Sequence, residues 1–191
     1  VNTLTSFQAN WNLVAGAASY RMDVSTDPCF VSYGAASASL QEFNAGVSAP
    51  AGWTFTSIGG TYTTAGNFGN TSPSLQMDAT GDRVQTNLLT GSTVATQLSV
   101  WLKGIATNAA GSLLIEGNDG TSWTTIQNIQ PLPTTGTTFS YNASSSPVMP
   151  CNMKQFRFTY TQGIGNLALD DVNITTATAT ASLVTGYNNL T

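Results

Sequence analysis

The chain has 191 residues, of which 41% are hydrophobic and only 7% are charged, and its formal net charge at pH 7 is −4. An average soluble domain carries about 25% charged residues, so Thr, Ser, Asn and Gly supply most of the polarity here, as on many extracellular β proteins. With five Lys and Arg residues and no run near the roughly 18 apolar residues of a membrane span, we expect no nucleic-acid partner, no basic membrane-binding surface and no membrane insertion.

Short runs rich in Val, Ile, Thr and aromatic residues recur along the chain, separated by Gly, Asn and Ser turn residues. They predict strands at 6–12, 19–25, 53–58, 74–77, 83–86, 97–102, 112–116, 124–129, 137–141, 155–161 and 166–174. Alternation is clearest over 155–161, where Phe156, Phe158 and Tyr160 share one face. No segment shows an apolar stripe at helical spacing. The pattern predicts an all-β fold, either a sandwich or a jelly-roll.

The first 40 residues carry a motif of their own. It runs Phe7-Gln8-Ala9-Asn10-Trp11 and continues through Tyr20 to Asp23-Val24-Ser25-Thr26. This motif resembles the first strands of fibronectin type III domains in secreted proteins of Bacteroidota-type bacteria. The resemblance implies that Trp11 and Tyr20 are core residues of a partial fibronectin-like region, residues 1–40.

Residues 41–175 resemble a second group, the β-jelly-roll modules of the MAM, cleaved-adhesin and carbohydrate-binding type. The residues that carry this resemblance are Gln41-Glu42-Phe43-Asn44, Pro50-Ala51-Gly52-Trp53, Ser72-Pro73-Ser74-Leu75, Leu98-Ser99-Val100-Trp101-Leu102-Lys103, Glu116-Gly117-Asn118-Asp119-Gly120-Thr121-Ser122-Trp123 and Leu169-Asp170-Asp171-Val172-Asn173-Ile174. The resemblance implies a jelly-roll joined to an incomplete fibronectin type III-like sandwich. It indicates a fold and not a ligand, because such a shell serves binding, adhesion and spacing alike.

The fibronectin-like region ends before a complete sandwich has formed, so its exposed sheet needs further strands. Residues 176–191 supply a candidate, since they alternate at period two and 183–191 resemble a later part of the same bacterial domains. The side chains expected to fill the gap are those of Leu183, Val184, Tyr187 and Leu190. Two interpretations stay open: the tail folds back on its own chain, or it completes the next molecule and builds a head-to-tail fibre.

Two cysteines, Cys29 and Cys151, lie far apart in the sequence and each follows a proline. Their spacing provides neither a CxxC redox motif nor a zinc knuckle. We expect a disulfide, which the sequence leaves open as a bond within one chain or between chains.

The chain contains no histidine and nine acidic residues, so the usual general base is missing and we expect no enzyme. We expect no cofactor other than a structural calcium ion. Modules that resemble residues 41–175 often hold calcium between a Glu near the first strand and an Asp near the last, which implies Glu42 and Asp170 here. The alternative is that Asp170 and Asp171 simply face solvent.

Sugar binding would need exposed aromatic rings as stacking platforms. Trp101 lies in an apolar run and is expected in the core, whereas Trp123 follows the Asn118-Asp119-Gly120 turn and Tyr62 lies in a Gly/Thr-rich segment. Trp123 and Tyr62 are therefore the candidate platforms for a polysaccharide.

Two functional hypotheses follow for a product that we expect at the cell surface or outside the cell. Val1 begins directly in polar, strand-like sequence, so we interpret the chain as a mature or excised product without its leader. The first hypothesis is a structural or adhesive protein, a repeat or subunit of a surface fibre that self-associates head to tail by strand addition. The alternative is a carbohydrate-binding module with a fibronectin-like spacer from a secreted multidomain enzyme.

Overall fold

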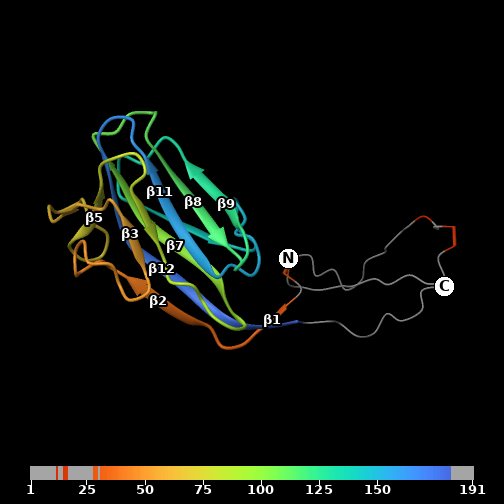
Figure 1. The fold of residues 1–191 in the computed structure, drawn as a ribbon. Coiled ribbons are helices and arrows are strands. Elements are labelled where there is room, and N and C mark those ends of the chain that lie inside the picture. Colours follow the sequence, from red (N-terminus) through yellow and green to blue (C-terminus); the bar gives the residue numbers. More distant parts are fainter. Residues whose placement is uncertain (1–11, 13–14, 17–27, 30, 182–191) are drawn as a thin grey trace, which may run out of the picture.

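The computed structural model describes residues 12, 15–16, 28–29 and 31–181, and all regular structure within them is β-strand (Figure 1). The twelve strands are β1 Val31–Tyr33, β2 Ser37–Gln41, β3 Thr54–Thr56, β4 Gly60–Tyr62, β5 Ser74–Met77, β6 Arg83–Gln85, β7 Thr93–Ile105, β8 Ser112–Asn118, β9 Trp123–Ile129, β10 Thr137–Asn142, β11 Gln155–Thr161 and β12 Asn166–Ala181. In this part of the chain no helix is long and apolar enough to cross a membrane.

Two antiparallel sheets pack face to face as a jelly-roll sandwich, which confirms the predicted all-β fold. The five-stranded sheet has the order β3-β6-β11-β8-β9. The seven-stranded sheet has the order β10-β7-β12-β5-β4, with β1 and β2 also pairing with β12. The strands β11 and β12 therefore have partners on both sides.

The core lies between the sheets and follows directly from period-two alternation. On β11, Phe156, Phe158 and Tyr160 are fully buried while the residues between them are only partly buried. On β7, every second residue from Leu98 to Leu102 points into the same core. The predicted aromatic face of residues 155–161 is thus an inner face of the sandwich.

The last strand, β12, is the longest element and pairs with β7 along most of its length. Its opposite edge pairs in turn with β5 at 167–169, β2 at 172–176 and β1 at 179–181. Figure 1 shows β1 and the end of β12 extending beyond the two packed sheets. The predicted domain limits at 40/41 and 175/176 fall inside β2 and β12, and most of the fibronectin-like region lies outside the described residues.

Nine of the eleven predicted strands have counterparts here, and β5 and β11 match their predicted bounds to the residue. The other two, at 6–12 and 19–25, lie outside the described residues apart from Asn12, which is not in a strand. Strands β1, β2 and β4 were not predicted; they are only three to five residues long, and most residues of β2 and β4 are Ser, Ala, Gly or Thr. Their pairing depends on a long neighbour rather than on their own pattern.

Candidate functional site

Three carboxylates lie close to one loop, at a bulge in the pairing of β12 with β7. The register between the two strands shifts between Asp170 and Asn173, and Asp171 has a φ of 45°, a left-handed conformation that Asp tolerates better than most residues. This bulge lets consecutive carboxylates approach one loop. Asp170 Oδ2 accepts a hydrogen bond from Gly69 N (2.8 Å), and Asp171 Oδ2 accepts one from Asn70 N (2.7 Å).

Glu42, just after β2, joins the same loop from the other side. Its Oε1 accepts a hydrogen bond from Asn70 Nδ2 at 2.7 Å. The loop backbone can reach Asp171 because residue 69 is glycine: a Cβ there would collide with the Asp171 carboxylate. Glu42, Asp170 and Asp171 are from here on called the acidic cluster.

Burial is the main reason why the pKa of Asp170 is raised to about 7. Hydrogen bonds from the backbone of Gly69 and Asp171 oppose the shift, whereas the negative charges of Asp171 and Glu42 add to it. The pKa of Asp171 is also raised, by burial and by the charge of Glu42. Asp170 is completely buried, so the alternative that it faces solvent is wrong.

The acidic cluster offers carboxylate oxygens, which are ligands that calcium prefers. One of its oxygens, Asp171 Oδ1, is buried without a hydrogen-bond partner. Among the described residues, however, no group of three or more His, Cys, Asp or Glu side chains is arranged so that it could hold a metal ion. The side chains are of the kind that binds calcium but are not arranged as a closed site, and calcium stays a proposal for Glu42 and Asp170.

The two candidate platforms lie on different sheets. Trp123 opens β9 and is partly buried, with the guanidinium of Arg157 4.2 Å from its ring centroid. Arg157 is itself paired with Glu116, through an Nη2 to Oε1 contact of 2.9 Å. Tyr62 ends β4, where its hydroxyl accepts a hydrogen bond from Asn166 Nδ2 (3.0 Å). The structure does not bring the two rings together as one platform.

Trp101, predicted in the core, is only partly buried. It stands on the outer face of β7, between the inward-facing Val100 and Leu102. Gly136 approaches its ring so closely that a Cβ there would overlap the ring, and a Cβ at Gly69 would lie 3.3 Å from it. An apolar run in a sequence does not reveal which residues face the core and which face outward. The outward-facing ring of Trp101 is covered by the two loops that contain Gly69 and Gly136.

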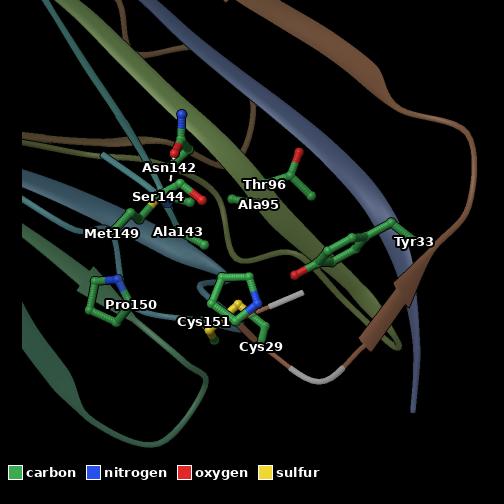
Figure 2. A pocket seen from close by; sticks show the side chains of 11 residues that line it. Cys29, Tyr33, Ala95, Thr96, Asn142, Ala143, Ser144, Met149, Pro150 and Cys151 are labelled. Atoms are coloured by element: carbon green, nitrogen blue, oxygen red, sulfur yellow. Dashed lines mark hydrogen bonds between the residues drawn. A yellow bond between two sulfur atoms is a disulfide. The ribbon is translucent and has the colours of Figure 1, made fainter. Parts of the chain in front are cut away.

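The disulfide is confirmed, and it lies within one chain. Cys29 and Cys151 are joined across a sequence separation of 122, with their Cα atoms 5.5 Å apart. Beside it is a cavity of about 350 Å³ between β1, β7 and the 142–151 segment, and Figure 2 shows Tyr33 extending from β1 toward the disulfide. The bond thus attaches the chain just before β1 to the body of the sandwich.

The predicted assembly residues Leu183, Val184, Tyr187 and Leu190 lie outside the described residues. Their role stays a prediction.

Comparison with solved structures supports the fold. The K2 cleaved adhesin domain of Lys-gingipain matches with a TM-score of 0.56 at 11% identity, over 72% of this chain and 99% of that domain. The K1 domain of Lys-gingipain from Porphyromonas gingivalis W83 matches at 0.54 and 15% identity, over 74% of this chain and 98% of that domain. A xylan-binding domain from CBM 22 matches with a TM-score of 0.46 at 17% identity, over 76% of this chain and 96% of that domain. This score is too low to support a conclusion.

No protein-family profile and no curated protein matches the sequence. At such low identities the cleaved adhesin domains share the jelly-roll sandwich with this chain and indicate nothing finer. The resemblances to fibronectin type III and MAM modules stay predictions.

Proposed function

We propose that this chain is a structural and adhesive module of an extracellular assembly, and that neighbouring copies join by β-strand addition. The observation that carries the proposal is an uncharged sheet edge, formed by β1 and β2, beside the point where β12 leaves the sandwich. This edge is from here on called the β1–β2 edge.

The β1–β2 edge has few of the features that usually prevent edge pairing. Both strands pair with β12 on one side, and among the described residues no strand pairs with the other side. Residues 31–41 contain no charged residue and no proline, whereas natural edges are commonly blunted by such residues. Ser37 to Leu40 are exposed, with Leu40 at 49%.

A donated strand would satisfy the open N–H and C=O groups of the β1–β2 edge. We propose that residues 182–191 of a neighbouring copy supply it, with Leu183, Val184, Tyr187 and Leu190 as the packing side chains. Copies related in this way form a head-to-tail fibre, because donor and acceptor are different surfaces of the same chain.

The disulfide and the low charge favour a location outside the cell, since disulfides persist in oxidising compartments. The jelly-roll shared with cleaved adhesin domains is compatible with an adhesive, non-catalytic role at the cell surface. These observations support the proposal without identifying a receptor.

Deleting residues 182–191 tests the proposal. We expect the intact chain to form concentration-dependent multimers in sedimentation experiments, and the truncated chain to stay monomeric with an unchanged far-UV circular dichroism spectrum. A matched control keeps the tail length but replaces Leu183, Val184, Tyr187 and Leu190 with Thr. If the truncated chain forms the same multimers, or the intact chain is monomeric at every concentration, strand addition by the tail is wrong.

Polysaccharide binding is the second candidate, favoured by one observation. Trp123 is a partly buried aromatic ring on an edge strand, next to an Arg157–Glu116 pair that could hydrogen-bond sugar hydroxyls. Affinity electrophoresis in gels containing xylan, β-glucan or dextran tests it. Retention that is lost in Trp123→Ala and kept in Ile164→Ala, a change at an exposed apolar residue elsewhere, would support the binding module.

A further inference from the structure

The first strand of the described sandwich and the end of its last strand lie side by side. Val31, the first residue of β1, is the cross-strand partner of Ala181, the last residue of β12. Cys29 lies two residues before β1. Along the backbone, a pull on the two ends of the chain is transmitted to these strands through Cys29 and through Ala181.

From Cys29 the covalent path divides. One branch follows the backbone through residues 30–150, which contain β1 to β10. The other crosses the disulfide directly to Cys151. Because a covalent bond hardly extends under forces that separate strands, tension takes the short branch and continues along residues 152–181. The long branch is a closed loop that cannot be drawn out while the disulfide is intact.

The short branch contains only two strands, β11 and β12, and each occupies a central place in its sheet (Figure 1). In the five-stranded sheet, β11 lies between β6 and β8 and pairs with β8 over all seven of its residues. In the seven-stranded sheet, β12 lies between β7 on one side and β5, β2 and β1 on the other. The strands that receive the tension are thus held by ladders on both edges.

We infer that the Cys29–Cys151 disulfide is a mechanical clamp, which directs tension between the chain ends into β11 and β12 and shields residues 30–150 from extension. This inference gives the disulfide a purpose within the proposed fibre. It depends only on the connectivity of one chain, so it can hold or fail independently of strand addition.

Single-molecule force spectroscopy on the full chain, held by handles at its two ends, tests the clamp. The disulfide encloses a sequence separation of 122, and an extended chain gains about 3.3 to 3.6 Å per residue. We expect complete unfolding of the oxidised protein to release a contour length that is shorter by about 40 nm than that of the same protein reduced on the tether.

The double variant Cys29→Ser, Cys151→Ser should show the long contour length with or without reductant. If that variant does not fold, the comparison of the oxidised with the reduced wild-type chain still tests the clamp. We also expect a higher unfolding force for the oxidised protein, because tension then acts on β11 and β12 rather than on the three-residue pairing of β1. An unfolding force that is the same in the oxidised and reduced protein, with the disulfide verified by mass spectrometry, would overturn the inference. A filament assay on the same samples reports separately on the proposed function.

Discussion

Asp170 and Asp171 are neighbours in sequence, yet the bulge in β12 directs both carboxylates to one loop, where Glu42 also lies. The sequence supplied Glu42 and Asp170 only through a resemblance, and it did not reveal that Asp170 would be buried or that Asp171 would share the loop. The signal that was available is Gly69, whose lack of a side chain permits the approach, but a single glycine does not indicate its partner.

The raised pKa of Asp170 predicts a pH dependence of stability. Its value in the folded protein is about 7, against an ordinary value near 3.8, so the folded state binds this proton more tightly than the unfolded chain does. The stabilisation is complete below about pH 4 and is lost as the pH rises through about 7. Without calcium, we expect the Tm measured by calorimetry to be lower at pH 8 than at pH 5.

Asp171→Asn should raise the Tm at pH 8, because it removes a like charge while the amide oxygen of Asn can still accept the hydrogen bond from Asn70 N that Asp171 Oδ2 accepts. Asp78→Asn, a change at an exposed carboxylate, is the matched control. A Tm that is constant from pH 5 to pH 8, or that rises over this range, contradicts the described environment of Asp170.

Calcium should act most strongly where the acidic cluster is ionised. At pH 8 we expect millimolar Ca²⁺ to raise the Tm of the wild-type chain by several degrees, since a ligand bound only by the folded state stabilises it, and we expect a chelator to reverse the shift. Glu42→Gln keeps an oxygen for Asn70 but removes a charge, so the response should shrink. The same calcium shift in Glu42→Gln as in wild type, or no shift in wild type, would exclude a site at Glu42 and Asp170.

At the scale of elements, the strands that the sequence predicts are those whose own residues alternate, such as β11. The β1–β2 edge was missed because β1 is only three residues long and the small Ser and Ala residues of β2 carry little strand signal, so that pairing with β12 determines where both strands lie. The same absence of signal matters for function: an edge strand that is uncharged and exposed can accept another strand.

A single lysine should blunt this edge. Ser39 lies in the middle of β2 and is exposed, so Ser39→Lys should leave the Tm within about a degree or two while weakening self-association at least tenfold, because a charge on an edge disfavours pairing. Thr124→Lys places the same charge on β9, an edge of the other sheet. Equal multimer formation by the two variants in sedimentation velocity would mean that β2 does not accept a strand.

At the scale of the whole molecule, composition and turn spacing were enough to predict a charge-poor β sandwich, and the cysteines were enough to predict a disulfide. The sequence did not reveal that the disulfide closes within one chain, because this depends on Cys29 and Cys151 meeting across the fold. The proposed assembly concerns more than one molecule, since we propose that residues 182–191 of one copy pair with the β1–β2 edge of another.

Mixed-isotope photo-crosslinking tests that claim most directly. Chains with a photoreactive phenylalanine analogue at Tyr187 are prepared unlabelled and labelled with ¹⁵N, mixed, unfolded, refolded together and irradiated. Mass spectrometry should then detect crosslinked peptides of mixed isotope content that join residues 182–191 of one chain to residues 31–41 of another. Crosslinks confined to pairs of the same isotope would show that the tail folds onto its own chain, and would contradict assembly by strand addition.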